Sequence, residues 1–387
     1  MKNLFLTSLF GLSLLIFGCN KVKTQPTSSA SSPANPIVET TMEQAKVQVA
    51  ILLDASNSMD GLIEQAKSRL WNIVNTITSL KFNGQEPLVE IALYMYGNDG
   101  LSERDNYIKQ ILPFTTDLDL ISEKLFAIKT NGGSEYCGAV IDHAVKKLDW
   151  GNKDSYMKLI YIAGNEPFTQ GKISYIEAAN DAVNKEIFIN TIHCGNCDVG
   201  INDKWKDGAE KGKGKYFCIN SDAKVMYVET PYDSDITKYN EQLNGTYIYY
   251  GQVGYSKYAN QSAQDNNAIG ISQENLTERA VSKSKSVYNN ESWDLVDKIN
   301  ADTTYVNKLD MKTLPEEYKN LSKEELTKEL EKKTAEREQI KKNIQDLSVK
   351  RQAYINNELK NKTTEDDFGA AVNKSIVEIA KIKGFKI

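Results

Sequence analysis

Short apolar runs alternate with amphipathic segments over residues 46–220, and this alternation constrains the fold more than any other feature. The runs that read as buried strands are residues 47–53, 89–95, 108–114, 157–163, 187–193 and 215–219. Helices are predicted between them, near residues 59–80, 118–126, 137–148 and 173–184. Continuous apolar strands separated by helices predict an α/β fold with a doubly wound, mostly parallel six-stranded sheet covered on both faces.

The first apolar run leads directly into the pattern D-x-S-x-S, formed by Asp54, Ser56 and Ser58. Ligand sites of such sheets lie at the carboxyl ends of the strands, so a site is expected in this loop. Carboxylate and hydroxyl oxygens are hard ligands suited to Mg²⁺, Mn²⁺ or Ca²⁺. The alternative is that these residues only order the loop and cap the next helix, whose first N–H groups need acceptors.

With this motif after the first strand, residues 46–225 resemble a von Willebrand factor type A (VWA) domain. That family binds protein partners through a metal-ion-dependent adhesion site (MIDAS) built from three segments. Asp54, Ser56 and Ser58 match the first segment, and Ser134 stands where the second usually has threonine. The resemblance implies a bound Mg²⁺, Mn²⁺ or Ca²⁺ and a protein partner whose acidic residue completes the coordination.

The third segment departs from the family pattern. Where the family has an aspartate at the end of the fourth strand, this chain has Gly164, and Asn165 and Glu166 are the nearest residues with side-chain oxygens. Losing a supporting carboxylate is expected to weaken cation binding by roughly tenfold or more. The sequence therefore predicts a VWA domain with a partly degenerate cation site, which either binds a cation weakly or holds none.

The N-terminus predicts export and lipid attachment. Lys2 precedes an apolar run over residues 4–17, which is too short to span a bilayer but typical of a signal peptide. The run ends in Ile-Phe-Gly-Cys, which resembles the bacterial lipobox, so residues 1–19 are predicted to be a lipoprotein signal peptide with Cys19 acylated. The alternative is a plain secretory signal with a chance cysteine.

Residues 20–45 are predicted to be a disordered tether, because residues 23–36 are rich in Ser, Pro, Thr and Ala and have little to bury. The expected location is the bacterial cell envelope, where a lipid anchor holds the protein at the outer membrane or the periplasmic face.

Four further cysteines are Cys137, Cys194, Cys197 and Cys218. An even number of cysteines in an exported protein predicts two disulfides, with three possible pairings. The run from His193 to Cys197 also resembles part of a zinc site or a redox pair. A single C-x-x-C motif late in the chain is weak support for either.

The remainder of the chain falls into two predicted parts. Residues 226–315 are rich in tyrosine and are predicted to pack on the VWA domain, or alternatively to form a recognition surface.

Residues 316–387 are charged and predict two helices, the first with a capping box at Ser322 and Glu325. These helices are predicted to form a coiled-coil-like hairpin that packs on the core, on itself or on a partner. Lys333, Arg337 and Arg351 interrupt its apolar stripe.

Composition and missing motifs limit the function. A net charge of −5 argues against nucleic acid as a partner. The two histidines, and the lack of a phosphate-binding glycine loop, a G-x-S-x-G elbow or an H-E-x-x-H helix, argue against an enzyme. The expected function is a protein-binding or adhesion module of the envelope. The alternative is a metal-free structural or assembly scaffold whose C-terminal helices contact the partner.

Overall fold

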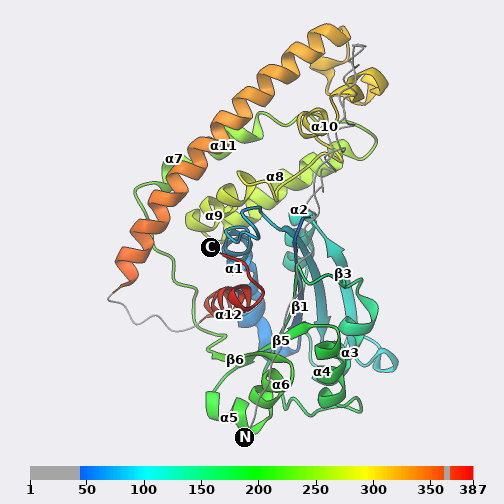
Figure 1. Ribbon diagram of the computed structural model, residues 1–387, viewed down its shortest axis with the longest axis vertical. Coiled ribbons are helices and arrows are strands. Elements are labelled where there is room, and N and C mark those ends of the chain that lie inside the picture. Colours follow the sequence, from blue (N-terminus) through cyan, green and yellow to red (C-terminus); the bar gives the residue numbers. More distant parts are fainter. Residues whose placement is uncertain (1–43, 361–366, 387) are drawn as a thin grey trace, which may run out of the picture. The chain divides into compact units, whose positions relative to one another are not determined.

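The computed structural model describes residues 44–360 and 367–386, so the predicted signal peptide, Cys19 and most of the predicted tether lie outside the described residues. A six-stranded sheet has the order β3-β2-β1-β4-β5-β6, and neighbouring strands are parallel except for β2 and β3 (Figure 1). The strands are β1 (Lys46–Asp54), β2 (Leu88–Tyr96), β3 (Ile108–Thr115), β4 (Tyr156–Gly164), β5 (Ile187–Cys194) and β6 (Lys213–Ile219). The predicted mostly parallel sheet is confirmed.

The central strand, β1, is buried along its whole length after Lys46. Its side chains alternate between two apolar clusters, with Val49 and Ile51 in one and Ala50 and Leu52 in the other. A strand buried on both faces has no polar stripe, which explains the continuous apolar run in the sequence.

Strand register determines where the polar loops lie. Asp54 pairs with Tyr96 of β2, and the preceding residue of β1 pairs with Ala163 of β4. Because the strands are parallel, the loops that follow β1, β2 and β4 leave the sheet at the same edge.

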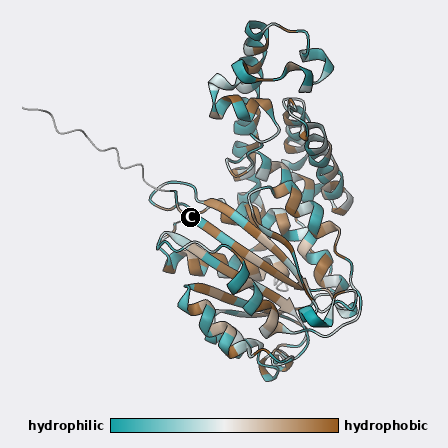
Figure 2. Cartoon of the chain, turned by 90° about the vertical axis from the view of Figure 1, so that its right-hand side faces the viewer, coloured by the Kyte–Doolittle hydropathy of each residue, from teal (hydrophilic) through white to brown (hydrophobic). Residues whose placement is uncertain are grey.

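Helices cover both faces of the sheet, and Figure 2 shows the hydrophobic strands lying between them. One face packs against α1 (Asp60–Ile77), α2 (Leu118–Phe126) and α12 (Phe368–Ile382). The other packs against α3 (Cys137–Lys147), α4 (Tyr175–Asn184) and α6 (Trp205–Lys211). Within residues 46–220 the structure adds two short helices that the sequence pattern did not predict, α6 and α5 (Cys197–Asn202). Single 3-10 turns lie at Asn57–Met59 (η1) and Glu103–Asp105 (η2).

A layer of helices lies outside α1 and α2. We call it the helical layer; it consists of α7 (Asp233–Asn244), α8 (Gly254–Ile271), α9 (Gln273–Lys283), α10 (Leu295–Ala301) and α11 (Lys323–Leu359). The α9 helix packs on α1 and α8 packs on α2, so the tyrosine-rich segment contacts the helices that cover the sheet. Between α10 and α11 the chain forms the 3-10 turns η3 (Thr303–Lys308), η4 (Met311–Thr313) and η5 (Glu316–Tyr318).

Both predicted C-terminal helices are present, and they pack on different parts of the molecule. The α11 helix begins with the predicted capping box, in which Ser322 and Glu325 each accept the other's backbone N–H. It packs mainly on α7, α9 and α10, whereas α12 packs mainly on α1 and also contacts β4, β5 and β6 (Figure 1). An ion pair of 2.5 Å between Arg69 of α1 and Asp367 fixes the start of α12.

No helix in the described part of the chain combines the length and the apolar composition needed to cross a membrane.

Candidate metal centre at the carboxyl edge of the sheet

The loop that follows β1 is fixed by hydrogen bonds to two neighbouring loops. Ala55 N donates to Tyr96 O at 2.8 Å, and Ala55 O accepts from Asn131 N at 3.0 Å and from Asn98 Nδ2 at 3.2 Å. These bonds hold the backbone of the D-x-S-x-S motif against the ends of β2 and α2, where a binding site needs rigid support.

The motif side chains lie together with one predicted partner from the end of β4. Asp54 is completely buried, and its Oδ1 accepts the N–H of Ser56 at 2.8 Å. The hydroxyls of Ser56 and Ser58 are 3.2 Å apart, and Asn165 Nδ2 donates to Ser58 Oγ at 3.3 Å. The structure therefore brings four of the predicted site residues into one cluster, while Ser58 remains exposed to solvent.

Helix capping does not account for the serine hydroxyls. Ser56 is the N-cap residue of η1 and Met59 that of α1, and neither side chain makes a capping hydrogen bond. Asp54 does order the loop through Ser56 N, but both hydroxyls keep lone pairs that can face a cation.

The second predicted segment presents a different side chain from the one expected. Ser134 is half-buried, and none of the hydrogen bonds among the described residues joins it to Asp54, Ser56 or Ser58. The next residue, Glu135, is buried, and its charge acts on that of Asp54. The sequence pattern did not indicate Glu135, because the family's second segment is matched by the hydroxyl residue before it, Ser134. The sequence feature that could have indicated a second carboxylate in the site is the acidic residue directly after Ser134, in the loop before α3.

Burial dominates the electrostatics of the centre. It raises the pKa of Asp54 from 3.8 to about 7. Burial also raises the pKa of Glu135 to about 7, and the nearby charges of Asp54 and Glu166 act in the same direction. No cationic side chain of the described residues forms an ion pair with either carboxylate, and Asp54 Oδ2 is buried without a hydrogen-bond partner. The two carboxylates therefore retain an unbalanced negative charge when ionised.

Gly164 leaves no room for the aspartate that the family has at this position. A Cβ atom there would lie 2.6 Å from the Tyr96 hydroxyl and 2.9 Å from Asp54 Oδ2. The Tyr96 hydroxyl is itself held by a 3.0 Å hydrogen bond to Ala163 O, so it cannot easily move aside. Asn165, one residue later, is the side chain that reaches the cluster.

The donor set fits a hard divalent cation. It offers carboxylate, hydroxyl and amide oxygens, which Mg²⁺, Mn²⁺ and Ca²⁺ prefer. Within residues 44–360 and 367–386, no three His, Cys, Asp or Glu side chains form a group that could hold a metal ion by themselves. A cation here would therefore depend on the serine hydroxyls as well as on the carboxylates.

The cysteines form one disulfide in the described structure, and the prediction of two is corrected. Cys197 and Cys218 are bonded, whereas Cys137 and Cys194 are free and buried. Cys194 packs in the apolar cluster on the α1 face of the sheet and Cys137 in the cluster on the α3 face. The sheet separates the two thiols, so they cannot pair. The disulfide also removes Cys197 and Cys218 from the zinc and redox alternatives.

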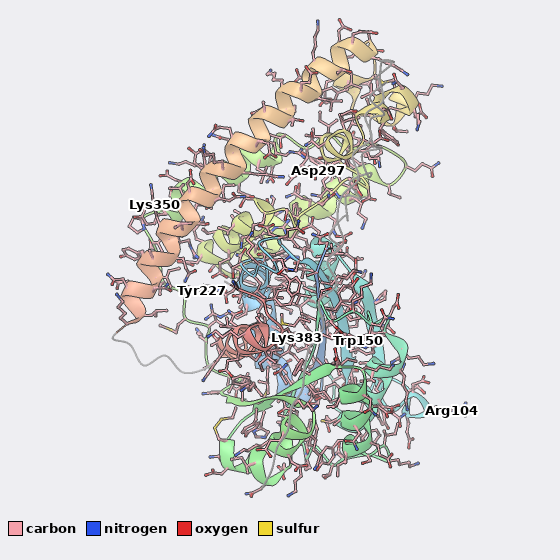
Figure 3. All side chains as sticks on the ribbon, in the orientation of Figure 1. Arg104, Trp150, Tyr227, Asp297, Lys350 and Lys383 are labelled. Atoms are coloured by element: carbon pink, nitrogen blue, oxygen red, sulfur yellow. A yellow bond between two sulfur atoms is a disulfide. The ribbon has the colours of Figure 1, made fainter. Side chains whose placement is uncertain are left out.

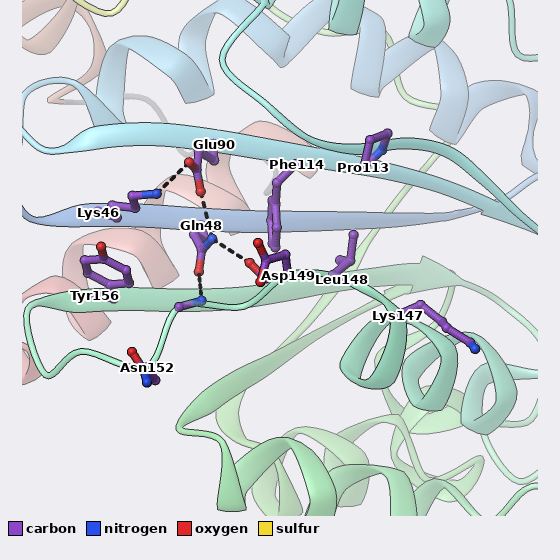
Figure 4. Close-up of a pocket in the computed structure, with 11 residues that line it drawn as sticks. Lys46, Gln48, Glu90, Pro113, Phe114, Lys147, Leu148, Asp149, Asn152 and Tyr156 are labelled. Carbon is purple, nitrogen blue, oxygen red and sulfur yellow. Dashed lines mark hydrogen bonds and ion pairs between the residues drawn. The ribbon is translucent and has the colours of Figure 1, made fainter.

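A cavity of about 380 Å³ lies at the opposite end of β1 (Figure 4). Gln48 lines it and is fully engaged, since its Nε2 donates to Glu90 Oε2 at 2.7 Å and its Oε1 accepts from Gly151 N at 2.8 Å. The amino end of a parallel sheet is not where ligands usually bind in this fold class, and this cavity adds no residue to the metal centre.

No protein-family model matches the chain, and no curated protein matches it in sequence. Among solved structures it is similar to BatB from Bacteroides thetaiotaomicron, with 18% identity over 45% of this chain and 90% of that one and a TM-score of 0.34. It is also similar to the SpRpn10 VWA domain, with 17% identity over 45% of this chain and 88% of that one and a TM-score of 0.35. A third similar structure is mussel byssus proximal thread matrix protein 1 with a zinc-occupied MIDAS motif, with 12% identity over 45% and 42% of the two chains and a TM-score of 0.35. Each likeness covers less than half of this chain, and the fold class rests on the strand order and register given above.

Proposed function

We propose that residues 46–225 form a VWA domain that binds a protein partner through a divalent cation held beside Asp54. The observation that carries this proposal is the completely buried Asp54, whose Oδ2 has no partner, next to the paired hydroxyls of Ser56 and Ser58. A buried carboxylate without a compensating charge is costly, and a cation would remove that cost. Mg²⁺, Mn²⁺ or Ca²⁺ is the expected ion.

The partner is a protein that offers an oxygen ligand, with an acidic side chain as the favoured chemistry. Ser58 and Asn57 are exposed, so the cation would be reached from solvent on their side of the centre. An anionic oxygen from a partner would complete the coordination shell there, which makes association depend on the cation.

Binding is favoured over the alternative of a metal-free scaffold with C-terminal contact helices. The apolar faces of α11 and α12 are largely covered within the molecule. The other helices of the helical layer cover α11, and α1 and the sheet cover α12. The large apolar side chains that the two helices leave exposed are Val349 and Tyr354 on α11 and Ile382 on α12, a small set for a docking face. We propose a binding role for this centre, because the donor set described above suits the coordination of a ligand.

The proposed location is the cell envelope, with a lipid anchor at Cys19. The lipobox-like sequence supports it, and the Cys197–Cys218 disulfide is typical of a protein that folds in an oxidising compartment. Expression of Cys19→Ser in a bacterial host tests the anchor. We expect the wild type to incorporate labelled palmitate during growth and Cys19→Ser to lose that label, and equal labelling of the two would contradict acylation at Cys19.

Thermal unfolding with Mg²⁺, Mn²⁺ or Ca²⁺ tests the cation site. After EDTA treatment, the wild-type melting temperature should rise with added cation, because a ligand that binds only the folded state stabilises it. Asp54→Asn should abolish the rise. Asp235→Asn, an exposed carboxylate on α7, is the matched control and should respond like the wild type. No shift in the wild type at millimolar cation would refute the cation site.

A further inference from the structure

Glu135 lies in the wall of the candidate metal centre. The residue is 5% exposed, and its backbone N–H donates to Gln170 Oε1 at 2.8 Å, which fixes it just before α3. Gly97 separates it from Asp54: a Cβ there would lie 2.7 Å from Glu135 Cγ and 2.9 Å from Asp54 Oδ1. Gly97 has φ +73°, a backbone conformation that favours glycine. The side chains of Asp54 and Glu135 therefore both pack against Gly97, and the missing side chain of Gly97 lets them lie close together.

The last position of β4 is closed to a carboxylate. Gly164 packs against Asp54 Oδ2 and the Tyr96 hydroxyl, so no side chain can stand at that position. Two other carboxylates supply negative charge near Asp54: Glu166, two residues later, and Glu135, which lies against Asp54 at Gly97.

We propose that Glu135 is a ligand of the divalent cation, together with Asp54, Ser56 and Ser58. This inference rests on the proposed function, because it needs a cation beside Asp54. Two carboxylates balance the charge of a divalent ion, and the two hydroxyls add neutral oxygens. The protein therefore retains its cation before any partner binds, and the partner completes a site that is already filled.

The hydrogen bonding of Asp54 also points to a ligand at this centre. Asp54 is completely buried, and its Oδ2 makes no hydrogen bond within the described residues, although the nearby Asn165 N–H and Ser56 hydroxyl oppose the rise of its pKa. Buried polar atoms in folded proteins nearly always have a partner, so the vacant acceptor indicates that a cation or its bound water completes the site.

Binding of Mn²⁺ to the purified protein, followed by the electron paramagnetic resonance signal of free Mn²⁺, tests the role of Glu135. Wild type, Asp54→Asn, Glu135→Gln and Glu166→Gln are compared without any partner protein. We expect wild type to bind, Asp54→Asn to lose binding, and Glu135→Gln to bind about 10–100-fold more weakly, as for the loss of a group that supports a metal. Glu166→Gln removes a nearby charge that the proposal does not assign as a ligand, and its loss should be smaller.

The outcomes separate this inference from the proposed function. If wild type binds no Mn²⁺, the cation site and this inference both fail. If Asp54→Asn abolishes binding while Glu135→Gln binds like wild type, only the role of Glu135 is overturned. Equal weakening by Glu135→Gln and Glu166→Gln would also overturn it, because a general charge effect would then suffice.

A folding defect is distinguished by the melting temperature of each variant in EDTA. Glu135→Gln removes an uncompensated buried charge, so its metal-free form should unfold at the wild-type temperature or above it. The rise in melting temperature on adding Mn²⁺, measured against each variant's own EDTA value, should shrink in Glu135→Gln. A rise equal to that of wild type overturns the proposal whatever the basal stability.

Discussion

Buried carboxylates lie in two regions of this molecule, and the charges around them differ. In the helical layer, Asp294 is completely buried and accepts a hydrogen bond from Arg337 Nη1 at 2.5 Å. The same nitrogen reaches Asp297, which Figure 3 labels, at 2.7 Å. At the carboxyl edge of the sheet, Asp54 and Glu135 are also buried, but no cationic side chain of the described residues pairs with them.

The pKa values of the carboxyl groups follow this difference at Asp265 but not at Asp294, where burial outweighs the charge of Arg337 and raises the pKa. Burial alone would raise the pKa of Asp265 in the helical layer, but Lys283 and Arg279 hold it well below its usual value. Burial raises the pKa of Asp54 and Glu135 to about 7. Asp265 and Asp294 have cationic partners within the chain, whereas Asp54 and Glu135 can be balanced only by protons or by a cation from solution. The first arrangement suits a structural role and the second a binding role.

The largest effect is expected from removing a cation in the helical layer. Arg337→Met leaves Asp294 buried without its partner, which should lower the free energy of unfolding by about 3–5 kcal/mol. Urea unfolding measures it. Lys332→Met on the same helix, where the side chain is 72% exposed, is the control and should change stability by less than about 0.5 kcal/mol. A loss as small as that of the control would show that Asp294 does not depend on Arg337.

At the metal centre, removing a charge should have the opposite sign. In EDTA at pH 8, Asp54→Asn should raise the melting temperature by about 2–4 °C, equivalent to roughly 1 kcal/mol in a domain of this size. The asparagine oxygen can still accept the Ser56 N–H, so the loop keeps its hydrogen bond. Asp265→Asn should instead lower the melting temperature, since it leaves Lys283 unbalanced and Arg279 with Asp119 as its remaining acidic partner. Destabilisation by both variants would remove the contrast between the two regions.

The pH dependence of stability should show the same contrast. Unfolded carboxyl groups titrate near pH 4, whereas Asp54 and Glu135 in the folded, metal-free protein titrate near 7. The stability contributed by their protonated forms is complete below about pH 4 and is lost as the pH rises through 7. The melting temperature in EDTA should therefore fall between pH 5 and pH 8. Saturating Mn²⁺ should reduce that fall, and Asp54→Asn should reduce it without metal. Equal slopes in all three samples would contradict the assignment.

The sheet was predictable because continuous apolar runs leave few alternatives. Residues 47–53 and 157–163 were predicted as strands, and β1 and β4 extend each by only one residue at either end. The short helices α5 and α6 were not predicted, because six and seven residues are too few to show a helical repeat of apolar residues. They are held instead by tertiary contacts, such as the Cys197–Cys218 bond at the start of α5.

For charged residues within apolar patterns, the sequence did not predict burial or the acidic partners. Arg337 and Arg351 looked like interruptions of an apolar stripe, yet both are buried and paired with acidic residues from distant parts of the chain. Their partners, such as Asp294 and Asp233, are far away in sequence, so local pattern could not identify them. Glu135 was missed for the same reason, because its position beside Asp54 depends on the loop at Gly97.

The smallest effect is expected at a carboxylate that combines features of both regions. Glu278 lies in the helical layer, but its Oε2 has no hydrogen-bond partner and the nearest nitrogen of Arg351 is 3.9 Å away. Burial raises its pKa, although Arg351 and Arg69 oppose the shift. The cost of burying this charge and the gain from its weak ion pair should nearly cancel. Glu278→Gln should therefore change the free energy of unfolding by less than about 0.5 kcal/mol at pH 7.

Asp233 provides the matched control for this last prediction. Arg351 Nε donates to its Oδ1 at 2.7 Å, and it also accepts the N–H of Thr230 at 2.8 Å. Asp233→Asn should cost about 1.5–3 kcal/mol, because a short, buried, charge-assisted hydrogen bond is lost. Urea unfolding of both variants measures the difference. If Glu278→Gln costs as much as Asp233→Asn, then proximity to an arginine at 3.9 Å is enough to balance a buried carboxylate. The absence of such an arginine around Asp54 and Glu135 would then mark the metal centre still more clearly.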